Sequence, residues 1–297
     1  MGSKATNTKV QIETLKERGL VLDYSDAEVK DFLLDIGYYR LGFYWHHFEI
    51  DEDHNFAPES KLSDVIALYY LDVDLRHILL RYLNRIEIHF RTKVVYYVSN
   101  KFKDSPAWYA DNSIVDNSFI QSTPFKRSML SRVYTKDFIK NNKTLKKHHI
   151  NNPEDTYAPA WKSLEFFTFG VLLNLFKNII DEDIKKRVTE SLGVLSPSKF
   201  ENLMSTVVLI RNICSHGDVL YDFKTPRGLS VVPGIDFEGS DRSSLNACVK
   251  VIAYLLEHIS ENRKNDFLEE INNLFTENFN NPTIKEIINE KIKYKLH

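Results

Sequence analysis

The chain has 297 residues, of which 43% are hydrophobic and 27% are charged, with ten glycines and nine prolines. This ordinary globular composition excludes a largely disordered protein. The formal net charge of −2 excludes a positive field over the whole molecule, so any affinity for RNA must come from local clusters of Lys and Arg. The two cysteines, Cys214 and Cys248, are too few for a structural zinc site within one chain. No signal-peptide core follows Met1, and no segment reaches the roughly 18 apolar residues that span a bilayer. We therefore expect a cytoplasmic protein with no membrane partner.

In the first hundred residues, glycines and capping residues mark the ends of the predicted helices. A helix over residues 9–18 ends at Gly19, and Ser25 with Glu28 is typical of a capping box that opens a helix to Gly37. Residues 38–45 are dense in aromatic side chains. Between residues 63 and 100 there is no Gly or Pro, and apolar residues recur every three or four positions. This pattern predicts one long helix, or two helices joined near residues 72–74.

The rest of the chain contains an interruption and then further helices. Residues 104–152 include two prolines, are rich in Asn and Ser and end in a basic run, so we expect an insertion over the core. A helix is predicted from Pro159 to residue 176, and a short one over 184–192. Ser196 and Pro197 form an N-cap and first-turn pair that starts a helix ending near Gly217. Residues 221–241 are irregular or form a short extended pair, and helices are predicted over 244–260, 265–279 and 282–293. The fold class is all-α.

Three residues at the end of the helix that starts at Ser196 could carry chemistry: Arg211, Asn212 and His216. Cutting RNA without a metal needs a base for the 2′-hydroxyl, an acid for the 5′-oxygen and a cation for the phosphoryl charge. Histidine suits either proton role, and the arginine fork matches phosphate oxygens. Asn212 could orient the phosphate or His216. Because one chain offers a single such histidine, a symmetric dimer would assemble the full set. On spacing alone, the alternative is an ordinary exposed helix end with Arg211 paired to an acid.

The motif of Arg211, Asn212 and His216 resembles the catalytic motif of the HEPN superfamily of helical ribonucleases. Nearly the whole chain resembles the Abi-like (AbiD/AbiF) abortive-infection proteins, a branch of that superfamily. After His216 the chain departs from the family pattern, because Gly217 and Asp218 stand where a small or basic residue and a Trp-Asn pair are usual. The segments that carry the resemblance are residues 11–19, the run from Ile36 to Trp45, Leu68 to Asp72 with Leu75 and Arg76, Arg85 to Glu87, Arg91 to Lys93, Pro159 to Trp161, Glu165, and Phe169 with Gly170.

This resemblance implies a HEPN-type antiparallel helical bundle with peripheral helices and a basic insertion. We expect a single domain over residues 1–297, with a core at about 8–222, the insertion at about 104–152 and a C-terminal helical addition at about 223–297. The implied function is a metal-independent endoribonuclease toxin of an abortive-infection or toxin-antitoxin system. It would leave a 2′,3′-cyclic phosphate, act as a homodimer on RNA and not on DNA, and be restrained by a small noncoding RNA. The alternatives are a HEPN module that binds RNA without cutting it and a purely structural helical partner.

The aromatic segment and the long helix contain further candidates. The five aromatic residues there could stack nucleobases or belong to the core, and Arg40 among them could bind a phosphate or form a structural pair. Glu87 and Arg91 have the spacing of an intrahelical ion pair. The family pattern suggests that Glu165 orients Arg211. The five aromatic residues are Tyr38, Tyr39, Phe43, Tyr44 and Trp45.

The densest positive run, residues 136–149, could bind RNA phosphates or be a solvated loop. Neither the pair His148 and His149 nor the pair His46 and His47 has a carboxylate or cysteine at ligand spacing, so we expect no metal site. No Walker loop, Rossmann glycine pattern or nucleophile elbow is present, and no cofactor is expected. The RNA-binding candidates in the run are Lys140, Lys143, Lys146, Lys147 and His148.

Overall fold

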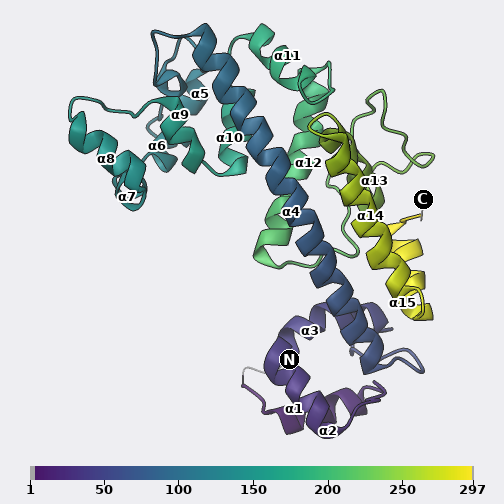
Figure 1. Ribbon diagram of the computed structural model, residues 1–297. Coiled ribbons are helices and arrows are strands. Elements are labelled where there is room, and N and C mark those ends of the chain that lie inside the picture. Colours follow the sequence, from purple (N-terminus) through teal and green to yellow (C-terminus); the bar gives the residue numbers. More distant parts are fainter. Residues whose placement is uncertain (1–3, 296–297) are drawn as a thin grey trace. The chain divides into compact units, whose positions relative to one another are not determined.

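The computed structural model describes residues 4–295, and their regular structure is helical (Figure 1). Within this part of the chain, β-type pairing is limited to isolated bridges. The predicted all-α class is therefore confirmed. None of the helices in the described range combines the length and the apolar character needed to cross a membrane.

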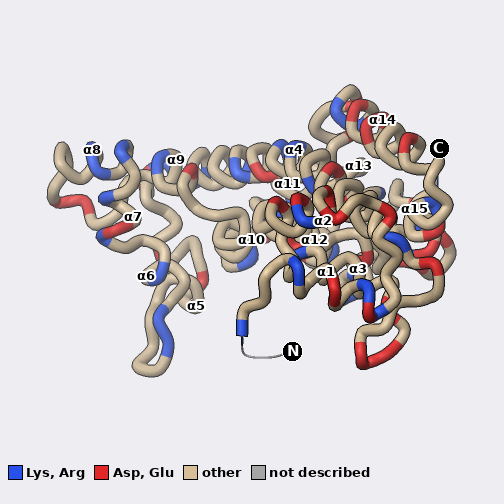
Figure 2. Tube along the Cα trace, turned by 90° about the horizontal axis from the view of Figure 1, so that it is seen from below, with Lys and Arg blue, Asp and Glu red and all other residues tan. Residues whose placement is uncertain are grey.

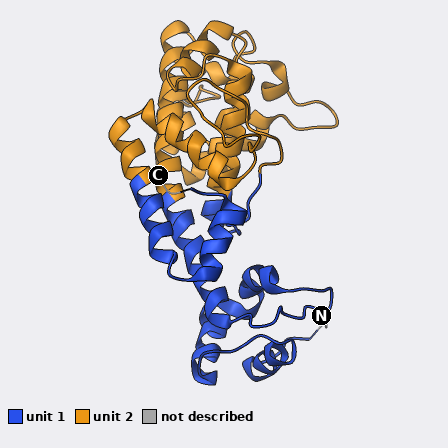
Figure 3. Cartoon of the chain, turned by 90° about the vertical axis from the view of Figure 1, so that its right-hand side faces the viewer, with its two compact units in different colours: residues 1–78, 213–224, 269–297 blue, residues 79–212, 225–268 orange. Residues whose placement is uncertain are grey.

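The chain divides into two compact units, and each combines segments that are distant in the sequence (Figure 3). Unit 1 contains residues 1–78, 213–224 and 269–297, and unit 2 contains residues 79–212 and 225–268. Both units therefore draw on the predicted core segment and on the C-terminal segment. The prediction of a single domain stays a prediction, and the two units are described separately.

Unit 1 begins with the helices whose ends the sequence marks. Asn7 caps the first helix, which ends at a left-handed Gly19, and Ser25 and Glu28 form the predicted capping box. Asp64, in the first turn of the long helix α4 (Leu62–Lys101), accepts hydrogen bonds from Asn281 (2.7 Å) and Thr283 (3.3 Å). The elements are α1 (Thr8–Glu17), α2 (Asp26–Phe32), a π-helical turn (Leu33–Gly37), α3 (Tyr38–Trp45), a 3₁₀ turn (His46–Phe48), α15 (Pro282–Ile287) and a second π-helical turn (Ile288–Ile292).

Helix α4 is one continuous helix of 40 residues, Leu62–Lys101, and contributes residues to both units. The break considered near residues 72–74 does not occur, because no Gly or Pro interrupts the backbone hydrogen bonds. In unit 2, Phe90 of α4 contacts Phe169 and Phe176 of α10 (Phe169–Lys177) and Phe200 of α12 (Pro197–His216), with ring centroids 5.3–6.2 Å apart. This aromatic cluster packs α4 against α10 and α12.

The remaining helices of unit 2 match the predicted ones closely. Ser244 caps α13 (Leu245–Glu257), most of whose residues are buried. Helix α14 (Glu261–Asn278) follows, and only its residues 261–268 belong to unit 2. Tyr82 of α4 contacts Phe267 of α14 with ring centroids 5.0 Å apart. In the irregular segment before α13, the backbone N–H of Thr225 donates to the carbonyl of Ser243 (2.9 Å), and no strand forms between residues 225 and 243.

The predicted insertion is not a bare loop but carries short helices around its own buried aromatic residues. Trp108 and Tyr109 are fully buried, and the Tyr109 hydroxyl donates to the carbonyl of Ala158 (2.8 Å). The short helices of this region are a 3₁₀ turn (Trp108–Ala110), α5 (Asn117–Ile120), α6 (Met129–Val133), α7 (Lys136–Asn141) and α8 (Lys143–Asn151).

The prediction of a single helix from Pro159 to residue 176 is wrong. The structure has α9 (Ala160–Ser163) and a 3₁₀ turn (Leu164–Phe166), and then an extended Phe167 interrupts the helix. Thr168 starts α10 by accepting a hydrogen bond from the backbone N–H of Val171 (3.4 Å). An N-cap hydroxyl accepts a hydrogen bond from a backbone N–H that has no partner within the helix, so a new helix begins after Thr168. The next helix, α11 (Glu182–Glu190), lies close to its predicted range.

Candidate functional site

The helix that carries the motif, α12, ends where the sequence predicts. Gly217 adopts a left-handed φ of +73°, and the backbone N–H of Asp218 donates to the carbonyl of Ile213 at 3.1 Å. This is the Schellman arrangement, in which glycine at the position after the helix avoids a Cβ clash. His216 is therefore the last helical residue, and its side chain is exposed. The boundary between the two units falls between Asn212 and Ile213, so Arg211 and His216 are described with their own units.

In unit 2, Arg211 is held by Glu87 of α4. Its Nη2 lies 3.2 Å from Oε2 of Glu87, and its side chain is 26% exposed. The buried Nε of Arg211 has no hydrogen-bond partner among the described residues, and Nη1 makes a long 3.5 Å contact with Oδ1 of Asn212. The guanidinium is thus oriented by one carboxylate while part of it stays accessible.

Glu87 is itself shared between two arginines. Its Oε1 accepts from Nη2 of Arg91 at 2.6 Å, which confirms the predicted intrahelical pair. Arg91 also donates to the carbonyls of Leu164 (2.9 Å) and Phe167 (3.0 Å), and to that of Glu165. Arg91 therefore fastens α4 to the turn that precedes α10.

The expectation that Glu165 orients Arg211 is not met, because the recorded carboxylate partner of Arg211 is Glu87. The Glu165 side chain is exposed, and only its backbone carbonyl joins the network, through Arg91. The helical spacing predicts Glu87 as a partner of Arg91 but does not predict its contact with Arg211. The signal available was the position of Glu87 on the same long helix as Arg91, in a segment that resembles the family.

In unit 1, the backbone beside His216 is held by Arg40 of α3. Nη1 of Arg40 donates to the carbonyl of Gly217 at 2.8 Å. Of the two interpretations of Arg40, this contact favours the structural pair, because the guanidinium binds the backbone carbonyl of the residue that follows the helix. The contact fixes the chain directly after His216.

The segment after the motif is anchored on a buried carboxylate in α4 that sequence analysis did not single out. Asp72 accepts hydrogen bonds from the Tyr44 hydroxyl (2.9 Å) and from the backbone N–H of Leu220 (3.1 Å), and it pairs with Arg76. Arg76 also donates to the carbonyl of Asp218 (3.1 Å). Burial raises the pKa of Asp72 to about 6, although Arg76, Tyr44 and the backbone donors act to lower it. The segment after the motif is therefore bound to α4 by two side chains, Asp72 and Arg76.

The cysteine inside the motif has low reactivity. Cys214 is buried, and this burial raises the pKa of its thiol to about 12. A thiol with so high a pKa stays protonated and is a poor nucleophile. The groups of the motif that remain able to act on a ligand are Arg211, Asn212 and His216.

Four of the predicted RNA-binding residues lie together on the surface of the α7–α8 region. Lys140 belongs to α7, and Lys143, Lys146 and Lys147 belong to α8; all four are exposed. Figure 2 marks the basic positions of these two helices. The run is helical and not a flexible loop, so its lysines are presented on fixed backbone.

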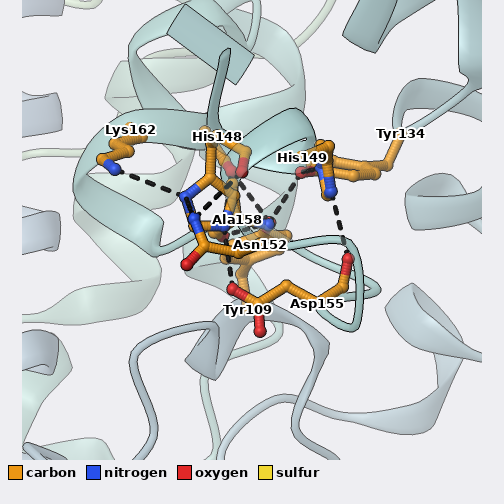
Figure 4. A network of polar contacts seen from close by, with 9 residues as sticks. Tyr109, Tyr134, His148, His149, Asn152, Asp155, Ala158 and Lys162 are labelled. Carbon is orange, nitrogen blue, oxygen red and sulfur yellow. Dashed lines mark hydrogen bonds and ion pairs between the residues drawn. The ribbon is translucent and has the colours of Figure 1, made fainter. Parts of the chain in front are cut away.

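His148, the fifth residue of that prediction, lies in the interior. Its Nε2 contacts Oδ2 of Asp155 at 2.9 Å, and its Nδ1 lies 3.3 Å from Nζ of Lys162 (Figure 4). Its side chain is only 5% exposed. The neighbouring His149 contacts the hydroxyl of Tyr134 at 3.0 Å. This placement favours a structural role for His148, in which it holds the end of α8 to the following turn.

The predicted aromatic segment contains both buried core residues and exposed residues that could contact a ligand. Tyr44 and Trp45 are buried and belong to the core, whereas Tyr39 and Phe43 are 80% and 45% exposed. The rings of Tyr39 and Phe43 meet edge to face, with centroids 5.1 Å apart. Together with Tyr38 and Trp45 they line a cavity of about 580 Å³.

The expectation that His46 has no carboxylate companion is wrong. Glu49 contacts Nδ1 of His46 at 2.7 Å and Nδ1 of His54 at 2.9 Å, both through Oε2. Burial by itself would raise the pKa of Glu49, but the hydrogen bonds from His54 and His46 outweigh it and hold the pKa below its usual value. Glu49 stands three positions after His46, and this local spacing was overlooked. His54 was missed because a turn brings it back toward Glu49. The three residues could hold a metal ion.

The comparisons with known proteins give one match. No curated protein and no solved structure matches the chain. A family model described as Abi-like protein matches residues 31–222, a range that includes α3, α4 and the motif at the end of α12. Since this range covers more than half of the 297 residues, the chain belongs to the Abi-like protein family, whose name indicates a role in abortive infection.

Proposed function

We propose that this Abi-like protein is a metal-independent endoribonuclease of the HEPN superfamily, which acts as a toxin in abortive infection. The observation that carries the proposal is the arrangement of α12. Arg211 is oriented by Glu87 yet partly accessible, and His216 is exposed at a helix end whose backbone is fixed. An arginine that is oriented by one acid while its side chain stays 26% exposed is suited to an additional anionic ligand.

In this mechanism Arg211 binds the scissile phosphate. Its guanidinium stays charged at any physiological pH and can donate to two phosphoryl oxygens at once. As the 2′-oxygen bonds to phosphorus, negative charge grows on those oxygens, and a preoriented cation stabilises it without having to reorganise. Glu87 supplies that orientation through its contact with Nη2 of Arg211.

His216 transfers protons. The 2′-hydroxyl loses its proton to a base and attacks the adjacent phosphorus, and the bond from phosphorus to the 5′-oxygen breaks as an acid protonates that oxygen. The products are a 2′,3′-cyclic phosphate and a free 5′-hydroxyl. One histidine cannot hold both proton roles in the same step, so the His216 of a second copy supplies the other role in an isologous dimer. Asn212 helps to orient the phosphate.

A toxin of this kind needs a restraint, and we assign that role to a small noncoding RNA. The exposed lysines of α7 and α8 offer positive charge that is distant in sequence from the motif. Contacts of lysines with phosphates hold RNA without reading its sequence and without cutting it.

The test uses untagged protein and a short RNA, in EDTA and with added Mg²⁺. We expect equal cleavage in both, a cyclic phosphate on the upstream fragment, and no cleavage when the cut position carries 2′-deoxyribose, because the nucleophile is then missing. A DNA of the same sequence is the second control. A strict requirement for Mg²⁺, or efficient cutting of DNA, contradicts the mechanism. RNA that is bound but left intact instead supports the alternative, a HEPN module that binds RNA without cutting it.

A further inference from the structure

We propose that His46, Glu49 and His54 form a binding site for one divalent transition-metal ion of the Zn²⁺ class, with a coordination position open to the aromatic cavity of unit 1. The proposal is independent of RNA cleavage. It rests on the donor set, on the spacing of the donor atoms and on the way the backbone presents them.

Two imidazoles and a carboxylate are a set that zinc accepts, often with water or another ligand in the fourth position. The three donor atoms all lie within 4.8 Å of one another. Ligands about 2.1 Å from a tetrahedral zinc ion are separated from each other by about 3.4 Å. The contacts of 2.7 and 2.9 Å that now join each Nδ1 to Glu49 therefore need to open by only a fraction of an ångström to admit the ion.

Glu49 provides a reason for a cation at this place. Its carboxylate is only 5% exposed, and its recorded ion pairs in the described chain are with the two histidines. A buried carboxylate needs compensating charge, and histidine supplies it only when protonated. A metal ion supplies the same compensation while both imidazoles are neutral, and it replaces the protons that they donate to Glu49.

The backbone around the cluster is already ordered. The segments on either side of the turn are joined by hydrogen bonds from Ile50 N–H to the Asn55 carbonyl (2.9 Å) and from Ala57 N–H to the Phe48 carbonyl (2.9 Å). Asp51 accepts from both the backbone and the side chain of Asn55 (3.0 and 2.8 Å). This turn returns His54, at a left-handed φ of +63°, to the side of Glu49.

The cluster also borders the cavity of about 580 Å³, which His46, Glu49 and His54 line together with aromatic side chains. The side chain of His46 is 77% exposed, so the cluster is open to solvent at His46. An ion with three protein ligands can therefore take its fourth ligand, a water or an anionic group, from the cavity.

The experiment uses untagged full-length protein, stripped with a chelator and dialysed. Zn²⁺ is titrated by calorimetry, and bound Co²⁺ is followed by its visible absorption. We expect one ion per chain, a rise in Tm on adding Zn²⁺, and a loss of affinity of about 100-fold or more in His46→Ala and in His54→Ala. The matched control is His77→Ala, which changes an exposed histidine of the same unit outside the cluster.

Two outcomes overturn the proposal: no stoichiometric binding by the unaltered chain, or unchanged affinity in both histidine variants. His46 is largely exposed, so its replacement leaves folding intact, and circular dichroism checks this. RNA cleavage in EDTA is measured on the same samples. Cleavage that persists without Zn²⁺ binding overturns only the metal site, and Zn²⁺ binding without cleavage overturns only the proposed ribonuclease.

Discussion

The two principal residues of the motif on α12 are fixed in opposite ways. Arg211 is fixed through its side chain, by the carboxylate of Glu87, which Arg91 in turn holds. His216 is exposed, and what is fixed is the backbone beside it, through the Schellman bond and the contact of Arg40 with Gly217. In the proposed mechanism, a residue that binds a phosphate in one geometry gains from a rigid side chain, whereas a residue that moves a proton to or from the substrate gains from a side chain that can rotate toward it. The predictions below test this contrast.

The largest effects should come from the two residues themselves. Arg211→Ala and His216→Ala should each lower RNA cleavage by about 10²-fold or more, because one removes the phosphate charge and the other the proton transfer. Initial rates on one RNA at equal protein concentration measure this. Asn212→Ala should be milder. If both alanine variants cleave at the unaltered rate, the site is elsewhere.

Mixing the Arg211→Ala and His216→Ala chains sharpens this prediction. If two motifs share one groove, mixed dimers should recover part of the activity. An unaltered chain that is monomeric by light scattering and yet fully active contradicts the dimeric site.

Glu87→Gln should lower cleavage about tenfold, because Arg211 keeps its charge but loses its orientation. It should also lower the free energy of unfolding by about 1–3 kcal/mol, since Arg91 loses a charged partner. Glu165→Gln is the matched control, because that side chain is exposed and its carbonyl is unaffected. Equal effects of the two substitutions would show that side-chain orientation is not what Glu87 contributes.

Arg40→Ala should have a smaller effect, a loss of about two- to fivefold in rate, the size expected for one hydrogen bond to a helix end. Arg40→Lys should recover part of it, because Lys can still donate to the Gly217 carbonyl. The comparison of the two rates at equal RNA affinity is the measurement. A loss as large as that of Arg211→Ala would mean that Arg40 itself contacts the substrate.

The smallest effect on cleavage should come from the exposed lysines of α8. Replacing Lys143, Lys146 and Lys147 with Glu should leave the cleavage rate on a short RNA unchanged. The triple variant should retain less co-purifying RNA, and that retention should depend less steeply on salt concentration. The matched control replaces three exposed lysines of unit 2 elsewhere: Lys103, Lys126 and Lys186. Equal retention in the two triple variants contradicts an RNA site on α8.

The sequence predicted the elements whose signals are local. The N-cap of α12, its terminal glycine and the pair of Glu87 with Arg91 all depend on residues at most four positions apart. The contact of Glu87 with Arg211 was missed because it joins helices far apart in the chain, and no helical spacing reports it. The anchoring of Leu220 on Asp72 was missed for the same reason. The return of His54 to Glu49 spans only five residues, and it was missed because it depends on the conformation of the intervening turn. The break at Thr168 was local and could have been found, since an N-cap residue stands there.

The cluster of Arg211, Arg91 and Glu87 has one consequence beyond orientation. Two permanent positive charges share a single carboxylate, so one unit of positive charge is left over in a partly enclosed place. Such a surplus attracts small anions from the solvent whenever RNA is absent. If the proposed mechanism holds, an RNA phosphate that enters there displaces an anion already present, and the ions of the medium compete with the substrate.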